Sequence, residues 1–572
     1  MQDLIIGIDL GTTNSAVAHI HDGLPVIIPI DGEPTMPSCV GLNPEGMLLV
    51  GREARNQYTV YPERTVLSVK RQMGNPTPLT IGEQSFRPEE ISALILKKLK
   101  AAAEAHLKQK VTKAVITVPA YFDEAQRKAT RNAGEIAGLE VVNILNEPTA
   151  AALAYGSLSD NEGITLVYDL GGGTFDASLV KNEQGVIEVK SSHGDTQLGG
   201  DDFDRILMRR ASEIFKEQHG IEITNDPIAT SRLKIGMEAA KIRLSTEPFT
   251  QVEEAFLHEG KSLQTELARA DYEDEIRALL EKTIGCCAQC LNDAEIRASQ
   301  LDRILLVGGS SRTPIVFELL KRHFQIEASH KLDPDLVVAY GAALQAASIA
   351  GVETSQILLD ITPHNLGIST LDNYYEEVFS PIISRNTPLP ASHSKVYYTT
   401  DDEQESCHIK VYQGAYNSLE KNDCLGDFTI TGLGKFPADS ELIVHFQLNL
   451  NGMLEVTATE KRTGLKKTVE FDTDGSDAAL DITATGQRMQ ALAGDEPQEE
   501  STEPASEGEA TPVAALKQRA DKLLKGESLD ADDRSEIQEC LEKIEAAQAG
   551  DDTDALDAQI TALEDILFFL ES

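Results

Sequence analysis

One stretch of the sequence places two carboxylates and a hydroxyl around three consecutive glycines. Asp169 precedes glycines 171–173, and Thr174 and Asp176 follow them. Three glycines permit positive φ angles and leave backbone N–H groups open to an anion, because no Cβ shields them. Carboxylate and hydroxyl oxygens suit a hydrated Mg²⁺ and a phosphate oxygen. The stretch is a candidate phosphate site, although a glycine turn between strands is more often only a turn.

The same design occurs a second time, near the N-terminus. There the apolar run LIIGID ends at Asp9, and the letters LGTTN lead into another apolar run. The two stretches lie about 160 residues apart, which predicts a duplicated fold whose halves face each other across one nucleotide. Neither is a P-loop, because no GK[ST] follows and each turn leads into a strand rather than a helix.

The segments between the two turns supply the elements that must position them. An amphipathic helix is expected over 88–105, a strand over 113–118 and a second helix over 123–138. A strand over 141–145 then leads to Glu147, with a proline at the first turn of the next helix, where its missing N–H is not needed. Glu147 is therefore held at a strand–helix junction, a suitable place for a catalytic carboxylate.

A long helical region is expected over 203–244. Glu238, Lys241 and Ser245 recur on one of its faces, and a solvated helix face is the simpler interpretation without further context. The later stretch LLVGGSSRTP reads as a strand, a glycine turn and a helix. Its bare backbone can approach a purine or ribose, and the planar guanidinium of Arg312 can stack on a base.

The character of the sequence changes after residue 355. Short alternating segments separated by turn residues, between 366 and 471, predict an antiparallel sandwich. The segment 494–510 has seven acidic residues and no basic one, which predicts a disordered tether. Three helical patterns follow, at 512–524, 532–549 and 553–570.

Length and composition limit the possible classes of protein. A chain of 572 residues is long enough for several domains. A net charge of −42, from 51 basic and 93 acidic residues, argues against a nucleic-acid binder or a polybasic membrane ligand. Seven scattered cysteines suit a reducing compartment, and the N-terminus MQDLIIGIDLG shows no signal-peptide pattern. We expect a cytoplasmic monomer without a membrane span.

The pattern Cys286-Cys287-x-x-Cys290 resembles half of a metal site. It lies within a helical pattern and has no matching ligand pair, so buried small residues are the better interpretation.

Eight motifs follow one another along the chain: IGIDLGTTNS (6–15), VKRQMG (69–74), VITVPAYFDEAQR (115–127), LNEPTAAALAYG (145–156), VYDLGGGTFD (167–176), GDTQLGGDDFD (194–204), LLVGGSSRTP (305–314) and VVAYGAALQAA (337–347). Together, and in this order, they resemble the nucleotide-binding domain of the 70-kDa heat-shock chaperones of the DnaK type. The resemblance continues through ILLDITPHNLGI (357–368) into the sandwich and covers roughly residues 1–475.

The resemblance implies a multidomain chain: a duplicated, two-lobed, actin-like α/β ATPase domain, then an antiparallel β-sandwich and a small C-terminal helical unit. The ATPase domain would span 1–354, the linker 355–361 and the peptide-binding sandwich 362–475. An acidic disordered tether would occupy 476–511, and a reduced, lid-like helical unit 512–572.

The resemblance also implies ATP or ADP with Mg²⁺ between the two glycine turns, with K⁺ as an additional candidate ion. Asp9 and Asp169 would hold the metal through water, Lys70 and Glu147 would orient the attacking water, and Thr174 and Asp176 would face the γ-phosphate. The phosphates and nucleoside would contact Gly11, Thr12, Thr13, Asn14, Gly171, Gly172, Gly173, Gly199, Gly200, Glu238, Lys241, Ser245, Gly308, Gly309, Ser310, Arg312 and Asp335.

In the same family, a switch between the domains reports the state of the γ-phosphate. The resemblance assigns this role to Pro119, Arg127, Leu358, Leu359 and Asp360. Peptide would lie extended in the sandwich, although sandwich core remains the alternative interpretation for any one of its apolar contacts. The peptide-contacting residues would be Ile368, Thr370, Leu371, Tyr397, Thr400, Cys407, Ile409 and Leu442.

Several departures point to an HscC-like specialised branch with a trimmed lid. The segment between Lys70 and Pro88 is short, and Asn143 replaces an arginine that contacts J-domain partners. The hairpin at 258–265 is short for an exchange-factor loop, Cys407 replaces a valine, and about 60 helical residues replace the long lid. A specialised J-domain partner is therefore expected, and the need for an exchange factor stays open.

Three functions compete. The first is an ATP-driven chaperone that gates the binding of extended hydrophobic segments of unfolded proteins, as in protein folding and the stress response. The second is a dedicated regulator of a single client within the same family. The third, an actin-fold sugar kinase or filament ATPase, shares the two glycine turns but not the ILLD linker or the sandwich.

Overall fold

The computed structural model describes residues 4–158, 162–352, 356–372, 374–433, 437–449, 452–471, 481–492 and 543. The chain divides into two compact units, Met1–Glu496 and Pro497–Ser572. The expected C-terminal helical unit and most of the expected tether therefore fall outside the described residues. Within the described ranges, no helix combines the length and apolar character needed to cross a bilayer.

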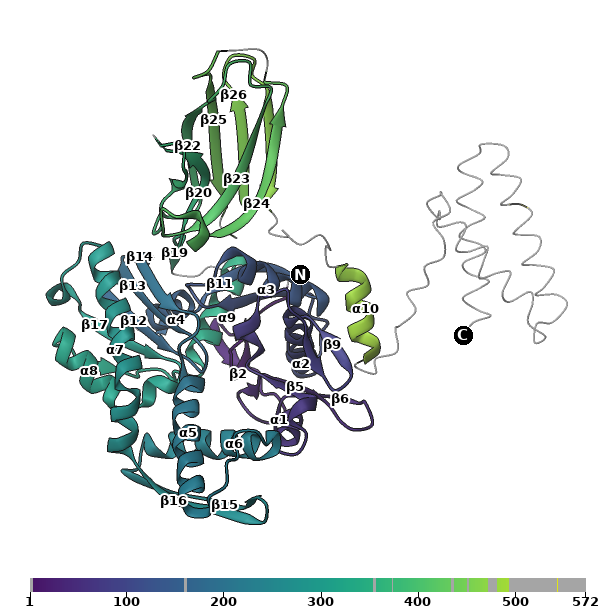
Figure 1. Cartoon of the computed structure of the whole chain (residues 1–572), viewed down its shortest axis with the longest axis vertical. Helices are drawn as coiled ribbons and strands as arrows, with labels where there is room; N and C mark the ends of the chain where they lie inside the picture. Colours follow the sequence, from purple (N-terminus) through teal and green to yellow (C-terminus); the bar gives the residue numbers. More distant parts are fainter. Residues whose placement is uncertain are drawn as a thin grey trace. The chain divides into compact units, whose positions relative to one another are not determined.

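A first sheet, in purple and blue in Figure 1, organises the N-terminal lobe. Its strand order is β11-β10-β1-β2-β3, with β4 paired to β2. β1 and β2 form an antiparallel hairpin, whereas β10 and β11 continue the sheet in parallel. The bounds are β1 (Ile5–Asp9), β2 (Asn14–His21), β3 (Leu24–Ile27), β4 (Met36–Pro37), β10 (Lys113–Val118) and β11 (Glu140–Asn146).

A second sheet repeats this plan in the other lobe. Its order is β18-β17-β12-β13-β14-β19, again an antiparallel hairpin (β12 and β13) extended by parallel strands on one side. The equivalent strand order is what a duplicated fold requires, and it brings the two glycine turns to equivalent places. The bounds are β12 (Gly163–Leu170), β13 (Phe175–Glu183), β14 (Val186–Asp195), β17 (Arg303–Val307), β18 (Ala328–Ser329) and β19 (Ile357–Leu359).

Helices bury the apolar faces of both sheets. α3 begins with a capping box, in which Gln126 N–H donates to Asp123 at 2.8 Å and the Gln126 side chain accepts from Asp123 N–H at 3.0 Å. α4 and α9 pack closely against each other between the lobes. A Cβ built on Gly341 of α9 would lie only 1.8 Å from Ala150 O of α4, so this contact requires glycine. The bounds are α2 (Pro88–Leu107), α3 (Glu124–Ile136), α4 (Glu147–Leu158), α7 (Arg269–Asp293), α8 (Pro314–Phe324) and α9 (Val337–Ile349).

The long helix expected over 203–244 is wrong in one respect, because two helices occupy the region. α5 (Gly200–His219) ends at Gly220, whose φ of 73° is left-handed, and α6 (Pro227–Leu244) starts after Asp226. The Asp226 side chain accepts from Ile228 N–H at 2.9 Å, and proline occupies the first helical position. These stop and start signals explain the break.

Smaller elements complete the two lobes. In the first lobe they are β5 (Cys39–Leu42), β6 (Leu48–Val50), α1 (Arg52–Tyr58), η1 (Pro62–Arg64), β7 (Thr65–Leu67), η2 (Val69–Gln72), β8 (Leu79–Ile81) and β9 (Gln84–Phe86). In the second they are β15 (Phe249–His258), β16 (Lys261–Ala268), η3 (Ala298–Gln300) and η4 (Gly309–Arg312).

The following segment is a sandwich of two antiparallel sheets, β21-β20-β23-β24 and β22-β25-β26-β27. Their inward side chains form one apolar core that includes Val411, Val444 and Phe446, each fully buried. The bounds are β20 (Asn365–Leu371), β21 (Glu377–Ile383), β22 (Ala391–Tyr398), β23 (Ser406–Gly414), η5 (Leu419–Lys421), β24 (Asp423–Thr431), β25 (Glu441–Leu448), β26 (Leu454–Glu460) and β27 (Lys466–Phe471).

The prediction of a disordered tether over 476–511 is wrong for residues 482–492, where α10 (Ile482–Leu492) forms. Met489 is 2 % exposed and belongs to the apolar core of the first lobe. Arg488 pairs with Glu90 at the start of α2 and lies over the Phe86 ring at 5.7 Å. Composition alone missed the helix because its stability comes from burial against another domain.

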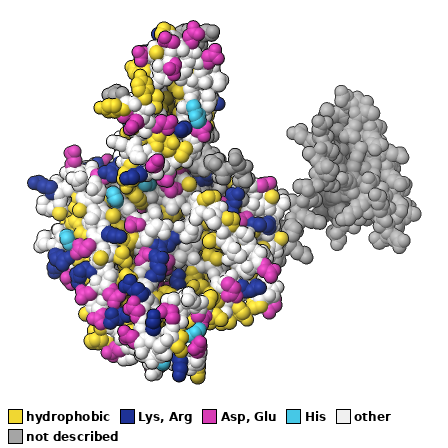
Figure 2. Space-filling view, viewed as in Figure 1, with side chains coloured by type: hydrophobic (Ala, Val, Ile, Leu, Met, Phe, Trp, Pro, Cys, Tyr) yellow, Lys and Arg dark blue, Asp and Glu magenta, His cyan; other side chains and the backbone are white. Residues whose placement is uncertain are grey.

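The visible surface carries both signs of charge. Figure 2 shows Lys and Arg side chains interspersed with Asp and Glu rather than gathered into one basic patch. This distribution agrees with the strongly negative composition.

Candidate functional site

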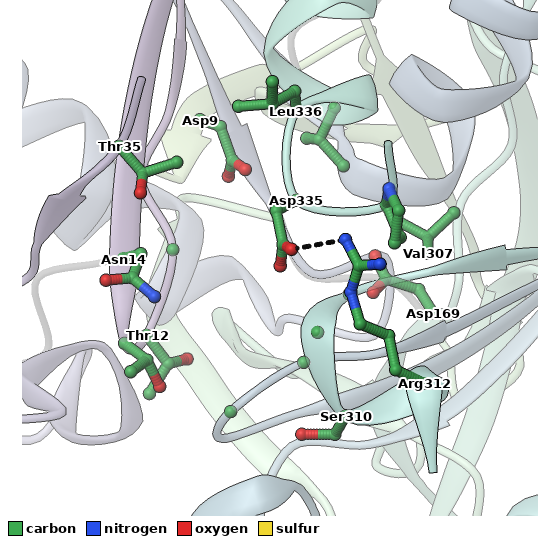
Figure 3. Close-up of a pocket in the computed structure, with 18 of the residues that line it drawn as sticks. Asp9, Thr12, Asn14, Thr35, Asp169, Val307, Ser310, Arg312, Asp335 and Leu336 are labelled. Atoms are coloured by element: carbon green, nitrogen blue, oxygen red, sulfur yellow. Dashed lines mark hydrogen bonds and ion pairs between the residues drawn. The ribbon is translucent and has the colours of Figure 1, made fainter. Parts of the chain in front are cut away.

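A cavity of about 410 Å³ is lined by the two glycine turns, by the C-terminal part of α6 and by η4. Figure 3 shows part of this cavity. Most of the predicted catalytic and nucleotide-binding residues line it. They are Asp9, Gly11, Thr12, Thr13, Asn14, Glu147, Asp169, Gly171, Gly172, Thr174, Glu238, Lys241, Ser245, Gly308, Gly309, Ser310, Arg312 and Asp335.

The first turn is held firmly by its neighbours. Asp9 ends β1, and its carboxylate accepts a hydrogen bond from Thr117 Oγ1 at 3.1 Å. Gly11 admits no side chain, because a Cβ there would lie 2.0 Å from Asn14 O, and its own carbonyl accepts from Ser38 Oγ at 2.7 Å. The backbone N–H groups of this turn are therefore fixed in place.

The second turn packs directly against the first. A Cβ on Gly172 would lie 1.9 Å from Thr13 Oγ1, and one on Gly173 would lie 2.5 Å from Thr12 Cγ2. Each glycine thus lets one turn approach the other from the opposite lobe. The two turns are therefore in direct contact, and both border the same cavity.

Gly199 and Gly200 lie behind the second turn and are not among the cavity-lining residues. The first N–H groups of α5 hold the turn from that side: Gly200 N–H donates to Gly171 O at 3.0 Å, and Asp201 N–H donates to Gly172 O at 2.7 Å. These two glycines therefore act on the cavity through the turn they support.

The remaining predicted catalytic residues surround the junction of the two turns. Lys70 in η2 forms an ion pair with Glu147, the first residue of α4, and their side chains are 3 % and 10 % exposed. Asp176 is 1 % exposed and accepts from Tyr121 N–H at 3.0 Å. Lys70, Gly173 and Asp176 lie just beyond the cavity lining.

Buried carboxylates are concentrated in this site. Burial, followed by the negative charge of Glu147, raises the pKa of Asp9 and of Asp176 to about 7. Burial followed by the charge of Glu147 likewise raises the pKa of Asp169. Lys70 is the cation that opposes these four carboxylates, so the site favours binding of an additional positive charge.

The donor set fits a hydrated magnesium ion. In the described ranges, no group of three or more His, Cys, Asp or Glu side chains is arranged to hold a metal directly. Mg²⁺ keeps several waters and binds through few carboxylates plus phosphate oxygens. Asp9 and Asp169, which both line the cavity, are therefore suitable as ligands acting through water.

The other end of the cavity has the polar groups that a nucleoside needs. Lys241 Nζ contacts Asp204 Oδ1 at 2.8 Å and Gly200 O at 3.1 Å, and Glu238 pairs with Arg55 at 2.6 Å. On the opposite side, the Arg312 guanidinium contacts Asp333 at 2.7 Å and Asp335 at 2.8 Å, and the second of these contacts is drawn in Figure 3.

A comparison with known families decides the identity. A family model described as Hsp70 protein matches residues 5–78 and 77–570. The chain belongs to the Hsp70 family. Membership supports an ATP-dependent chaperone in general, with ATP or ADP and Mg²⁺ as ligands, and with client polypeptides and J-domain co-chaperones as the partners typical of the family.

The Hsp70 cavity also includes residues that sequence reasoning did not single out. Asp204 ends the motif GDTQLGGDDFD, and the pair Asp333-Pro334 directly precedes Asp335 and the motif VVAYGAALQAA, so these neighbouring motifs were the available signal. Pro34 and Thr35 come from a loop without any motif. The full set is Pro34, Thr35, Asp204, Ile242, Val307, Thr313, Asp333, Pro334, Leu336 and Val338.

Two of the predicted switch residues, Leu358 and Leu359, lie at the edge of the second sheet, and the neighbouring Asp360 connects them to the first lobe. Strand β19 pairs in parallel with β14, with Leu358 opposite Ile187 and Leu359 opposite Glu188. Asp360 accepts from Asn146 Nδ2 at 3.0 Å, and Arg127 donates to Asn146 Oδ1 at 2.5 Å.

Arg127 also reaches the loop that follows Pro119. It donates to Ala120 O at 3.2 Å and to Phe122 O at 3.3 Å. Arg127 and Asp360 therefore share one polar network with Asn146, which connects α3, the end of β11, the loop after β10 and the linker.

The predicted peptide-contacting residues divide into two groups in the sandwich. Ile368, Ile409 and Leu442 belong to the apolar core and are at most 4 % exposed. Leu371 and Thr400 reach the surface, whereas Thr370, Tyr397 and Cys407 are partly buried. The sandwich-core interpretation thus accounts for the first group, and the second group presents the accessible side chains.

The cysteines of α7 are structural. Cys287 and Cys290 are fully buried, and Cys290 Sγ donates to Ala177 O at 3.1 Å. Both belong to the apolar core of the second lobe, as the sequence interpretation expected.

Proposed function

We propose that this Hsp70 chain hydrolyses ATP between its two glycine turns and thereby gates the binding and release of extended hydrophobic segments in its sandwich. The observation that carries the proposal is the cavity itself. It joins two opposed glycine turns and a buried group of carboxylates to a polar pocket at the ends of α6 and η4.

In this proposal the backbone N–H groups of residues 11–13 and 171–174 cradle the phosphates. Bound Mg²⁺ neutralises phosphate charge, and Asp9 and Asp169 would hold it through water. Hydrolysis of a phosphoanhydride depends mainly on positioning and charge stabilisation, so fixed turns are well suited to it.

Lys70 and Glu147 would orient the attacking water. Their ion pair is buried, which fixes both side chains and keeps bulk water from competing for them. Thr174, which is 6 % exposed and lines the cavity, would donate its hydroxyl to the γ-phosphate. Glu238, Lys241, Ser245 and Arg312 would hold the nucleoside end.

The linker would carry the state of this site to the sandwich. Asn146 immediately precedes Glu147 and bonds to Asp360 of the linker, so loss of the γ-phosphate has a short path to β19. The sandwich would hold peptide in an extended form, through backbone hydrogen bonds and apolar side chains.

The test compares ATP turnover with and without an extended apolar peptide. The control is a peptide of the same length with serine in place of its apolar residues. Faster turnover with the apolar peptide alone, and a peptide affinity that differs between ATP and ADP, supports the proposal. Equal peptide affinity in both nucleotide states contradicts it.

A second candidate within the family is a dedicated regulator of one client, as in an HscC-like branch with a trimmed lid. The position of α10 favours it, because this first described helix after the sandwich buries Met489 in the ATPase domain. An uncovered sandwich would exchange peptide rapidly. A peptide dissociation half-time of many minutes in the ADP state would count against this candidate.

A further inference from the structure

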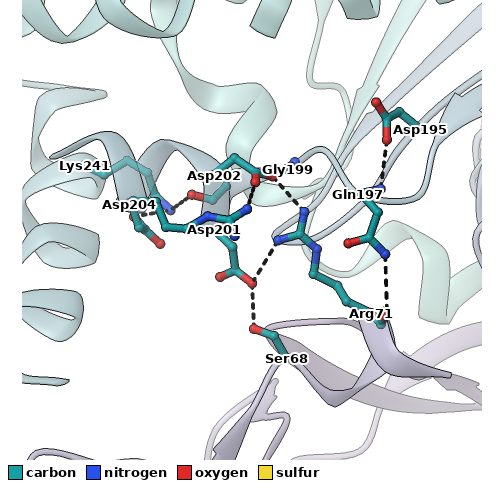
Figure 4. A network of polar contacts seen from close by, with 11 residues as sticks. Ser68, Arg71, Asp195, Gln197, Gly199, Asp201, Asp202, Asp204 and Lys241 are labelled. Carbon is teal, nitrogen blue, oxygen red and sulfur yellow. Dashed lines mark hydrogen bonds and ion pairs between the residues drawn. The ribbon is translucent and has the colours of Figure 1, made fainter. Parts of the chain in front are cut away.

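Arg71 forms a bridge between the two lobes beside the catalytic lysine. It follows Lys70 in η2, yet its guanidinium extends to the opposite lobe, where Nη2 lies 2.8 Å from Asp202 Oδ2 (Figure 4). Nη1 lies 4.0 Å from Asp201 in the same α5 turn. Two adjacent residues of one short helix therefore serve different partners, Lys70 in the cleft and Arg71 across it.

The anchor of Arg71 is the element that supports the second glycine turn. Asp202 accepts from Gly199 N–H at 2.8 Å and so caps α5, whose first N–H groups hold the carbonyls of Gly171 and Gly172. Asp202 also pairs with Arg205, an exposed residue on the following turn of α5. A displacement of Arg71 would therefore shift Asp202 and the start of α5, and with them the second glycine turn.

The stem of Arg71 also contacts the turn directly. A Cβ built on Gly173 would lie 2.9 Å from Arg71 Cγ, so only glycine leaves room for this side chain. The Arg71 side chain is 9 % exposed. Its Nε is buried without a hydrogen-bond partner among the described residues, whereas a purely structural arginine usually satisfies this group.

Ser68 strengthens the same bridge from the start of η2. Its hydroxyl donates to Asp201 Oδ2 at 2.6 Å, and its φ of 54° is left-handed, an unfavourable conformation for a residue with a Cβ. Gln197 adds a bond from the second lobe to Arg71 O at 3.3 Å. Backbone strain that is held by surrounding bonds is typical of functional sites.

We propose that Arg71 is a positioning residue for hydrolysis: through Asp202 it sets the spacing between Lys70 and the second glycine turn, so that lobe closure and alignment of the attacking water occur together. This inference rests on the proposed ATP hydrolysis. It assigns Arg71 no contact with the reacting atoms; Arg71 acts on Lys70 through η2 and on the phosphates through the turn.

A simple latch is the competing explanation, and the molecule contains a matched control for it. Arg55 of α1 bridges to Glu238 of α6 at 2.6 Å, also from lobe to lobe but at the nucleoside end of the cavity. Loss of a latch speeds nucleotide release without changing the chemical step. Loss of a positioning residue slows the chemical step itself.

The experiment measures single-turnover hydrolysis of prebound ATP, and separately the release of labelled ADP, at saturating Mg²⁺. Arg71→Ala is expected to slow single-turnover hydrolysis by about tenfold or more, since small misplacements in a site have effects of this size. Arg55→Ala is expected to speed ADP release and leave single-turnover hydrolysis unchanged. Arg71→Lys, which keeps the charge without the planar fork, should recover only part of the rate.

Asp202→Asn tests the bridge from the other side, because its amide oxygen can still cap Gly199 N–H while the charge is removed. Asp202→Asn should also slow single-turnover hydrolysis. The double variant Arg71→Ala/Asp202→Asn should be no slower than Arg71→Ala alone, because both changes break the same bridge. If Arg71→Ala fails to fold, the hydrolysis rate of Asp202→Asn distinguishes a positioning residue from a latch.

If Arg71→Ala and Asp202→Asn both hydrolyse ATP at the wild-type rate but release ADP faster, Arg71 is a latch and the inference is overturned. If the wild-type chain itself does not hydrolyse ATP, the proposed function falls with it. Hydrolysis by the wild type with an unchanged Arg71→Ala rate removes only this inference.

Discussion

The side-chain amide of Asn146 donates a hydrogen bond to the carboxylate of Asp360 at 3.0 Å. Asn146 ends β11, and the next residue, Glu147, begins α4 and pairs with Lys70. Asp360 of the linker is therefore bonded to the residue that directly precedes the proposed water-orienting carboxylate. Burial raises the pKa of Asp360, whereas the charge of Arg127 and the bond from Asn146 oppose that shift.

Asn146→Ala should uncouple the two domains. It removes both the donor to Asp360 and the acceptor for Arg127, and it leaves Lys70, Glu147 and both glycine turns in place. We expect basal ATP turnover within about threefold of wild type and loss of most stimulation by an apolar peptide. Steady-state turnover across a peptide titration measures this.

The matched control is Asn143→Ala, which makes the same substitution earlier on the same strand. It should keep peptide stimulation. Equal stimulation of Asn146→Ala and wild type would show that Asp360 does not carry the signal.

Thr174→Ala should slow hydrolysis and leave nucleotide binding nearly intact. The change removes one hydroxyl but keeps the backbone, whose carbonyl accepts from Gly171 N–H at 3.1 Å and shapes the turn. Removal of one such donor typically lowers the rate by about 10²-fold. Single-turnover hydrolysis and equilibrium binding of a fluorescent nucleotide separate the two effects. Thr174→Ser should keep most of the rate, and a large loss of affinity in Thr174→Ala would place the residue in the binding turn instead.

The two glycine turns were predictable because strand–Asp–Gly–Thr–strand is a local pattern that occurs twice. The carboxylate partner of Lys70 was predictable as a residue, through the family motif, but not as a buried ion pair. Pro34 and Thr35 could not be predicted, since a loop of the first lobe reaches the cavity only through tertiary packing.

Helix α10 also depends on tertiary packing that the sequence does not reveal. Residues 482–492 contain no acidic residue, but two threonines and a glycine among them are poor helix formers, so helix propensity alone does not favour structure there. Burial of Met489 against the first lobe supplies the missing stabilisation. The break between α5 and α6, in contrast, had local signals in Gly220 and Asp226-Pro227, which the apolar periodicity over 203–244 obscured.

Gly341→Ala should destabilise the ATPase domain. A Cβ at this position of α9 would lie 1.8 Å from Ala150 O, a backbone atom of α4 that cannot move alone. Overpacking of this kind typically costs about 1–3 kcal/mol. The control is Gly285→Ala in α7, where nothing lies within 4 Å of the added methyl group.

Gly285→Ala should stabilise by roughly 0.5–1 kcal/mol, because alanine is the better helix former. Urea denaturation followed by far-ultraviolet circular dichroism measures both variants. Equal midpoints for the two variants would contradict the close packing of α4 on α9.

Acid should weaken the contact between the sandwich and the ATPase domain through His364. This residue precedes β20, and its Nε2 donates to Tyr121 O at 3.2 Å while its ring meets the Tyr121 ring at 4.6 Å. Burial lowers the pKa of His364 from 6.5 to about 4; the hydrogen bond to Tyr121 opposes this shift, and Arg127 and His193 add to it.

The neighbouring His193 of β14 stacks on the same Tyr121 ring, at 5.0 Å. Burial lowers the pKa of His193 as well, and the charge of Arg385 acts in the same direction while Asp293 opposes it. Arg385 itself bonds to Asp293 at 2.7 Å and joins the two domains at this point. Both histidines therefore favour the neutral state in the contact.

A depressed pKa means that protonation favours the separated domains. The stabilising contribution is complete above pH 6.5 and is lost as the pH falls toward 4. For His364 alone, the shift corresponds to about a tenfold change in the docking equilibrium at pH 5.5.

Hydrogen exchange of the β19 amides, corrected for the intrinsic pH dependence of exchange, reports docking, because Ile357 N–H donates to Gly185 O at 2.9 Å. We expect protection to fall between pH 7 and 5 in the wild type, and to fall less in His364→Leu, which cannot be protonated there. Parallel loss of protection in both proteins would assign the acid sensitivity to other groups, with His193→Gln as the next variant to separate them.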